Sequence, residues 1–413
     1  MDHLTSTPCE GNPLVFDVAQ QRVLSFGNSI VGAESIPIAE CATRVLAEDV
    51  VAIRDYPAED NSAMDGYACR FADVIRFGKL SVQQRCAAGT LPAPLVPGKA
   101  TRVSTGSLIP EGADVVIIQE HAVEHQGVVR VSREVMSGQN IRRKGEDIKR
   151  GDALLDRGTL LCPADVGVLA TQGISDVRVR KRLRVGILTS GDEVTQAGGS
   201  INRAQSFDVN TPMLKSLLLR LGAEITECIH VRDSIDDSTA ALRKLHSTTD
   251  VIICAGGISV GERDYLKEAL KSLHARLELC RVWMKPGKPV SRATLWDKPV
   301  VCLPGNPGAA FCVFLLLVSP LIRRLQGRTL VIPQVSKLPV RHSLQGSRGR
   351  DDFLRADLNL DGNSRPQVVP LTSQSPGAVS SLSRSSGLIR ARPSRTYAEG
   401  ELMEFYDFSH WLC

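Results

Sequence analysis

Glycines and carboxylates lie together in one short stretch of this chain, "GGISVGERD" at residues 256–264. Glycine lets backbone N–H groups approach an anion closely, and a helix that follows such a loop adds its positive N-terminal end. The stretch therefore predicts a phosphate cradle, although a tight turn needed only for packing would carry the same glycines. Its spacing matches neither of the standard nucleotide motifs, G-x-G-x-x-G and G-x-x-x-x-G-K-[ST].

Four further loops combine small or turn-forming residues with charged or polar side chains. They are "TSGDEV" (189–194), "HVRDS" (230–234), "MKPGKP" (284–289) and "LPGNPG" (303–308). Four acids accompany these loops: Asp192, Glu193, Asp233 and Asp264. Carboxylates repel a phosphate unless a cation lies between them, and Mg²⁺ binds one or two carboxylates together with substrate phosphates. Lys285 and Lys288 add positive charge for an oxyanion, although a single charge of this kind is more often a solvated loop residue.

The segment that carries these loops, about residues 183–329, alternates between strand and helix patterns. "DVIICAGG" (250–257) predicts a buried strand, and "TPMLKSLLLRLG" (211–222) predicts a helix with Pro212 in its first turn. "LELCRVWMK" (277–285) predicts one further strand. Such alternation predicts a parallel sheet with helices on both faces, and ligands of these sheets bind at the carboxyl ends of the strands. We therefore expect the five loops at one edge of the sheet.

The flanking segments have other patterns. Residues 51–142 and 330–413 contain short alternating runs between prolines and glycines, which predict two β-rich units. "NPLVFDVAQQRVLSF" (12–26) and "PADVGVLATQGI" (163–174) look helical, and we expect these two helices to pack together around the inserted β unit.

The composition of the chain limits what kind of protein it can be. The chain has 413 residues, 43% hydrophobic and 23% charged, with a formal net charge of +5. These values predict a globular protein of about two to four domains that binds neither nucleic acid nor membrane. No signal-peptide pattern is present, and the apolar run Ala309–Val318 is about half as long as a membrane span. The eleven cysteines form no C-x-x-C pair, which predicts reduced thiols and a cytoplasmic protein.

Seven stretches, in this order, resemble the molybdopterin molybdenumtransferase family, the molybdenum-insertion enzymes of molybdenum cofactor synthesis. They are "DNSAMDGYA" (60–68), "STGSLIPEGADVVIIQE" (104–120), "GQNIRRKGEDI" (138–148), "TSGDEV", "GGISVGERDY", "KPGKP" and "LPGNP". The resemblance covers about residues 14–410, and the recurrence of seven unusual stretches in order makes it highly specific.

The resemblance implies a multidomain α/β plus β fold with four parts. They are a segmented helical connector (14–50 and 143–182), an inserted β-rich domain (51–142), a central parallel-sheet α/β domain that binds molybdopterin (183–329) and a C-terminal β-barrel-like domain (330–413). It also implies a homodimer in which the inserted domain of one chain faces the α/β domain of the other. The implied reaction inserts molybdate into adenylylated molybdopterin and releases AMP, with Mg²⁺ as cofactor. Implied partners are a molybdopterin adenylyltransferase and molybdoenzyme apoproteins or their chaperones.

Functional residues follow from the resemblance position by position. The implied catalytic residues are Asp65, Asp147, Glu193, Asp233, Asp264, Lys285 and Lys288, with Asp233 and Asp264 also as Mg²⁺ ligands. The implied substrate-binding residues are Thr105, Arg142, Ser190, Gly191, Asp192, Gly256, Gly257, Ser259, Gly261, Pro304 and Pro307. The basic side chains would attract the dianionic molybdate and the leaving phosphate, and the acids would place Mg²⁺ or polarise water. Which acid has which role stays open.

One segment departs from the family pattern. The family has Gly-(Glu/Gln)-Ile-Tyr-Asp-x-Asn where this chain has "AQSFDVN" (204–210), so Ala204 replaces glycine and Phe207 replaces tyrosine. The lost phenol would weaken one contact to substrate.

Two other functions stay open: an adenylyltransferase acting one step earlier, and a non-catalytic scaffold similar to the gephyrin C-terminal domain. The intact acids and lysines favour retained catalysis.

Overall fold

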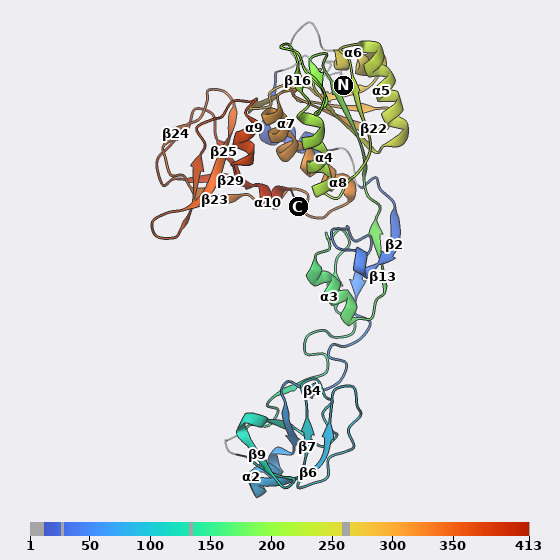
Figure 1. The fold of residues 1–413 in the computed structure, drawn as a ribbon, viewed down its shortest axis with the longest axis vertical. Helices are drawn as coiled ribbons and strands as arrows, with labels where there is room; N and C mark the ends of the chain where they lie inside the picture. Colours follow the sequence, from blue (N-terminus) through green and yellow to red (C-terminus); the bar gives the residue numbers. More distant parts are fainter. Residues whose placement is uncertain (1–11, 26–28, 132–134, 258–264, 413) are drawn as a thin grey trace, which may run out of the picture.

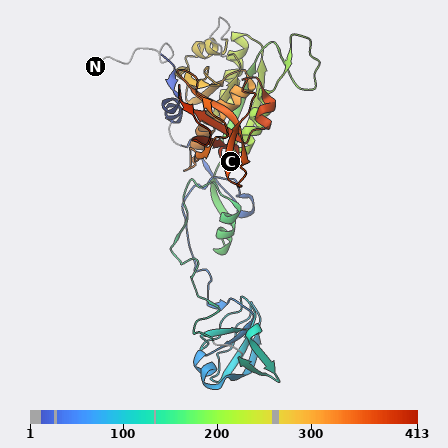
Figure 2. The same cartoon turned by 90° about the vertical axis from the view of Figure 1, so that its left-hand side faces the viewer.

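The computed structural model describes residues 12–25, 29–131, 135–257 and 265–412. A large body holds two sheets, and a small β domain lies at the far end of the molecule, separated from the large body by a narrow connector (Figure 1). The view turned by 90° shows the same three parts in a line (Figure 2). The position of a residue along this axis therefore decides which site it can serve within one chain.

The α/β sheet of the large body has six strands. In spatial order they are β17 (Glu224–Val231), β14 (Arg184–Ser190), β18 (Val251–Ala255), β22 (Lys298–Leu303), β21 (Ser291–Leu295) and β19 (Arg276–Leu279). The first four are parallel, but β21 and β19 are antiparallel to their neighbours, so the prediction of a parallel sheet was wrong at this edge. Only Trp296 and Asp297 join β21 to β22, and a connection that short permits a hairpin but no parallel crossover.

Helices cover both faces of this sheet. α4 (Asn210–Arg220) contributes to the apolar core on one face, and α5 (Ile235–Thr248) and α6 (Tyr265–Ser272) contribute to the core on the other. Ser234 caps the N-terminus of α5, because its hydroxyl accepts a hydrogen bond from the Asp237 N–H at 3.2 Å. This cap is the local reason that a helix starts directly after the β17 loop.

A continuous helical segment forms the centre of the large body. It consists of α7 (Pro307–Val313), a π-helical turn (Phe314–Val318) and α8 (Ser319–Gln326). Its 20 residues are long and apolar enough to cross a membrane, but 89% of its apolar window is buried inside the structure, as in a core helix. α1 (Phe16–Leu24) packs beside it, and Gln20 Nε2 donates to the Leu316 carbonyl at 2.8 Å.

The expectation that the two flanking helices pack together was wrong. α1 buries Phe16, Ala19 and Val23 along one face in the core of the large body. α3 (Pro163–Thr171) instead buries Leu169 in the separate core of the connector. Helical periodicity shows which face of each helix is buried, but it does not show which neighbour covers that face.

The C-terminal sheet takes strands from three parts of the chain. In order they are β1 (Leu14–Val15), β20 (Val282–Lys285), β25 (Asp351–Leu360), β27 (Gly387–Ala391), β29 (Leu402–Asp407) and β23 (Ser336–Pro339), with β26 (Pro366–Pro370) beside β25. A bridge between Val340 and Val368 joins the end of β23 to β26 around an apolar core.

The single strand predicted over 277–285 is two strands in the structure, β19 in the α/β sheet and β20 in the C-terminal sheet. That prediction was wrong because a run of apolar residues does not show where the chain changes sheets.

The connector and the distal domain are built mainly from strands. The connector holds β2 (Ala33–Pro37), β3 (Val50–Val51), β12 (Ala153–Leu155), β13 (Asp176–Arg180) and α3. The distal sheet runs β8 (Val115–Ile118), β5 (Gly66–Cys69), β7 (Lys99–Val103), β6 (Lys79–Cys86), β10 (Val128–Val131) and β9 (Ala122–His125), with α2 (Phe71–Phe77) packed on it. The ribbon of β4 (Asn61–Ser62) and β11 (Ile141–Arg142) lies at the connector side of this domain (Figure 1).

Most of the described cysteines are in no disulfide, and five of these are buried in the large body or the distal domain: Cys69, Cys86, Cys254, Cys302 and Cys312. Cys280 is disulfide-bonded, so the prediction of reduced thiols fails there. The lack of C-x-x-C spacing carries no information about cysteines that are distant in sequence and close in space.

Candidate active site

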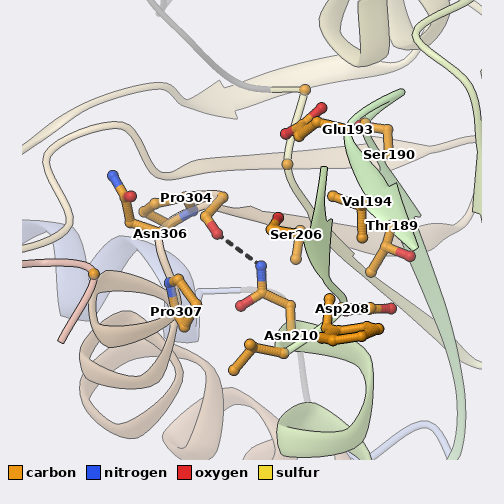
Figure 3. A pocket seen from close by; sticks show the side chains of 18 of the residues that line it. Thr189, Ser190, Glu193, Val194, Ser206, Asp208, Asn210, Pro304, Asn306 and Pro307 are labelled. Carbon is orange, nitrogen blue, oxygen red and sulfur yellow. Dashed lines mark hydrogen bonds between the residues drawn. The ribbon is translucent and has the colours of Figure 1, made fainter. Parts of the chain in front are cut away.

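A cavity of about 620 Å³ lies at the carboxyl ends of β14, β18 and β22, where the sequence predicts the site (Figure 3). Eight of the predicted residues line it: Ser190, Gly191, Glu193, Asp233, Gly256, Gly257, Pro304 and Pro307. Parallel strands bring their carboxyl ends to one edge, and this edge collects loops that are up to about a hundred residues apart in sequence. Ser259, Gly261 and Asp264 were also predicted for this site, and they lie outside the described residues.

The two leading glycines of the 256–264 loop are required by close packing. Gly256 and Gly257 have φ of +93° and +65°, which favour glycine. A Cβ at Gly256 would lie 2.7 Å from the Ser190 carbonyl oxygen, and a Cβ at Gly257 would lie 2.8 Å from the Ser190 hydroxyl. The loop therefore rests directly on the end of β14. Packing accounts for these two glycines, and the Gly256 N–H donates to the Leu303 carbonyl at 3.3 Å.

Two buried polar atoms in the cavity wall have no hydrogen-bond partner: Ser190 Oγ and Asn210 Oδ1. The amide of Asn210 is fixed, because its Nδ2 donates to the Gly305 carbonyl at 2.7 Å (Figure 3). Buried polar groups are normally hydrogen-bonded, so unsatisfied atoms in a cavity wall are typical of a site for a polar ligand. Asn210 ends the segment 204–210 and was not predicted as a site residue, although its place after β16 (Ser206–Phe207) could have shown it.

The acids form a loose group at this edge. Asp192 Oδ1 accepts a hydrogen bond from the Asp233 N–H at 3.3 Å, and Glu193 lines the cavity beside them. Within the described residues no three His, Cys, Asp or Glu side chains are close enough together to hold a metal ion. The fit to Mg²⁺ is therefore limited to a site in which the protein supplies one or two carboxylates and a ligand supplies the other oxygens.

The two predicted lysines do not line the cavity themselves. Lys285 ends β20 and is exposed, and Lys288 Nζ lies 4.8 Å from the centre of the Trp283 ring. The next residue, Pro289, does line the cavity. The lysine loop reaches this edge because it precedes β21, which runs antiparallel and therefore starts where β22 ends. The loop lies at this edge through Pro289, but the predicted reason for its place, a preceding parallel strand, was wrong.

The C-terminal domain supplies another wall of the cavity, through Gly377 and Val379. The buried Arg355 of β25 holds the preceding loop, because its Nη2 donates to the carbonyls of Ser373 at 3.2 Å and Ser375 at 2.9 Å. Burial lowers the pKa of the Arg355 guanidinium. The sequence did not identify Arg355, since its neighbours in the loop are about twenty residues away along the chain.

Asp65, Thr105 and Arg142 belong to the distal domain, which lies at the other end of the molecule (Figure 1), and Asp147 lies just beyond its boundary at residue 142. Asp65 Oδ1 accepts hydrogen bonds from the Thr105 N–H at 2.6 Å and the Thr105 hydroxyl at 3.0 Å, and these bonds hold the pKa of the Asp65 carboxyl below its usual value. Arg142 lies on β11, paired with Asn61 of β4, and Asp147 follows in the next turn. All four predicted side chains are exposed, and the connector separates them from the cavity of their own chain.

Comparison with known families covers almost the whole chain. Residues 14–173 match the MoeA N-terminal region (domain I and II), residues 186–324 match the probable molybdopterin binding domain, and residues 337–408 match the MoeA C-terminal region (domain IV). A Haemophilus influenzae protein named molybdopterin molybdenumtransferase is 33% identical over 407 residues, which span 97% of this chain and 100% of that protein. The chain belongs to the molybdopterin molybdenumtransferase family. The resemblance seen in the seven motifs is thereby confirmed, and the protein is an enzyme of molybdenum cofactor biosynthesis.

Other molybdopterin molybdenumtransferases and related structures agree over full length. A Staphylococcus aureus protein of this name is 30% identical over 384 residues, covering 92% of this chain and 91% of that protein. Two structures of a molybdopterin biosynthesis MoeA protein from Pyrococcus horikoshii superpose with TM-scores of 0.78 and 0.82 at 28% and 26% identity. They cover 96% and 95% of this chain and 99% of each of those chains, so the multidomain α/β plus β architecture is shared.

Proposed function

We propose that this chain inserts molybdate into adenylylated molybdopterin and releases AMP. The observation that carries the proposal is the cavity at the carboxyl edge of the α/β sheet, within the segment that matches a molybdopterin binding domain. Its glycine loop and the unsatisfied Ser190 and Asn210 atoms suit a polar, phosphorylated ligand. Lys285 and Lys288, on the loop beside the cavity, would attract molybdate and the departing phosphate.

The acids would serve the pyrophosphate end of this ligand. Asp233, with Asp264, would hold a Mg²⁺ that arrives with the substrate phosphates, and this ion would neutralise charge on the phosphate oxygens. Glu193 and Asp192 would orient water or substrate at the same edge. These roles extend the family assignment to individual residues of this chain.

The inserted domain would complete the site of a second chain. Asp65, Thr105, Arg142 and Asp147 lie at the far end of their own chain, and a homodimer would bring them to the cavity of the partner. A molybdopterin adenylyltransferase in the cytoplasm would supply the substrate, and molybdoenzyme apoproteins or their chaperones would receive the product.

One assay tests the reaction: AMP release from adenylylated molybdopterin, with and without molybdate. We expect AMP release that depends on molybdate and on Mg²⁺. Incubation of the chain with ATP and metal-free molybdopterin serves as the control. Adenylylated product in that control would assign the enzyme to the preceding step, and the absence of turnover in both assays would favour a scaffold.

A further inference from the structure

Phe207 supplies an aromatic ring to the cavity of the large body. Within the described part of the chain it is the only aromatic residue that lines the cavity, and 42% of it is exposed. No other described ring packs against it. The exchange of the family's tyrosine for phenylalanine removes the hydroxyl at this position and keeps the ring. The face of this ring is therefore available to a ligand.

The residues on both sides of Phe207 are held by hydrogen bonds. The Ser206 N–H donates to the Glu193 carbonyl at 2.8 Å, and the Asp208 carboxylate accepts from the Thr211 N–H at 2.9 Å. Ser206 and Asp208 both lie in the cavity wall (Figure 3). The backbone at Phe207 is thus fixed before a ligand binds, which lowers the entropy cost of a contact with its ring.

The ring of Phe207 is unsuited to the phosphate end of a ligand. An aromatic face carries partial negative charge, so it repels an anion but packs well against another ring. The proposed substrate contains two planar nitrogen heterocycles, the pterin of molybdopterin and the adenine of the adenylyl group. The cavity of about 620 Å³ is within the size range of sites that enclose most of a drug-sized ligand, so a phosphate and a ring can occupy it together.

We infer that Phe207 determines specificity by stacking on a planar nitrogen heterocycle of the substrate. The inference rests on the proposed function, because that function supplies the ring. The polar atoms of the cavity bind the phosphate of any ligand of this class, whereas the Phe207 ring favours those ligands that also carry a heterocycle. Stacking on an aromatic side chain tolerates different heterocycles, so adenine and pterin share this chemistry. The contact needs the ring and not a phenol hydroxyl, which agrees with phenylalanine at this position.

Ligands with and without a heterocycle test the contact without relying on activity. AMP and ribose 5-phosphate share the ribose and the phosphate, and 6-hydroxymethylpterin represents the pterin. We would titrate each ligand into the full wild-type chain, Phe207→Leu and Phe207→Tyr by isothermal titration calorimetry. Phe207→Leu should weaken the binding of AMP or of the pterin by about fivefold, because leucine keeps the apolar contact and loses the stacking. It should leave the affinity for ribose 5-phosphate unchanged, and Phe207→Tyr should retain the wild-type affinities.

The outcomes separate this inference from the proposed function. A loss confined to AMP assigns adenine to Phe207, and a loss confined to 6-hydroxymethylpterin assigns the pterin. Unchanged affinity of Phe207→Leu for both of these ligands, or an equal loss for ribose 5-phosphate, overturns the inference while the proposed function stands. A wild-type chain that binds neither AMP nor 6-hydroxymethylpterin overturns both. Phe77→Leu is the matched control and should bind as wild type does, because Phe77 of α2 is 49% exposed and lies in the distal domain.

Discussion

Gly257 shows at the scale of one residue how strand and loop define the cavity. A methyl group at this position would meet the Ser190 hydroxyl at 2.8 Å, and φ is +65°. Gly257→Ala should therefore shift the glycine loop, lower the unfolding free energy by about 1–2 kcal/mol and weaken ligand binding at the cavity. Gly198→Ala is the control, because Gly198 has φ of +93° with nothing within 4 Å. Urea unfolding should show backbone strain in both variants, and AMP titration should show a binding loss only in Gly257→Ala; equal binding would mean that the loop adapts.

Asp65 permits a test of electrostatics in the distal cluster. Its pKa is lowered by the Thr105 N–H and then by the Thr105 hydroxyl. Thr105→Val removes only the hydroxyl, so the pKa of Asp65 should rise part of the way to its ordinary value. Because the folded-state pKa is depressed, the interaction stabilises the fold above the ordinary aspartate range and is lost as pH falls through the depressed value. Carbon-detected NMR titration measures the shift. Asp361, whose pKa is lowered by the Arg365 and Asn363 N–H groups, should not move.

The sequence predicts some site residues well and others not at all. Ser190 ends β14, and Glu193 and Asp233 follow β14 and β17 within three residues, so their types and positions were enough to place them at one edge. Asn210 and Arg355 enter the site from a helix and from another domain, through contacts to Gly305 and to the 373–378 loop. Such contacts depend on how domains pack, which local periodicity does not encode.

At the scale of elements, α1 is held to the C-terminal sheet by one buried arginine. Arg390 of β27 donates to Asp351 at 2.8 Å and to Asp17 of α1 at 2.7 Å, and its guanidinium lies 4.7 Å from the Phe16 ring centre. Arg390→Met should leave the buried Asp351 carboxylate with only a 4.0 Å ion pair to Arg392 and lower the unfolding free energy by about 3–5 kcal/mol. Arg392→Met, at a side chain that is 38% exposed, should cost about 0–1 kcal/mol. Similar losses in thermal and urea unfolding for the two variants would contradict this difference.

The elements themselves were predicted more reliably than their partners. The pattern that predicted strand β18 and helix α4 is local, and both form where it placed them. Residues 277–285 form two strands in different sheets, and α1 packs in the large body and not with the connector. In each case a segment distant in sequence covers the apolar face. β20 pairs with β1, more than 260 residues earlier, and no local pattern records that pairing.

At the scale of the molecule, Gly158 of the connector packs against Gly327 and Thr329 of the large body, and we call this contact the neck. The neck sets the position of the distal domain. A Cβ on Gly158 would lie 2.8 Å from the Gly327 carbonyl and 2.9 Å from the Thr329 methyl, and φ is +91°. Gly158→Ala should therefore tilt the connector, change the small-angle scattering profile and lower turnover, while AMP binding at the cavity stays unchanged. Gly151→Ala is the control, since Gly151 has φ of +95° with nothing within 4 Å. A scattering profile identical in both variants would mean that the neck absorbs the methyl group.

Subunit exchange between two inactive variants would show whether the site is shared between two chains. Asp65 and Glu193 lie at opposite ends of one chain, so a shared site would combine Asp65 of one copy with Glu193 of the other. Asp65→Ala and Glu193→Ala homodimers should each be nearly inactive, because both of their sites carry a substitution. In a heterodimer of the two variants, one site carries both substitutions and the other carries neither. Random exchange at equal amounts should therefore restore about one quarter of wild-type activity, as two-fold symmetry requires. If differently tagged subunits exchange and activity stays absent, Asp65 acts within its own chain or has no part in turnover.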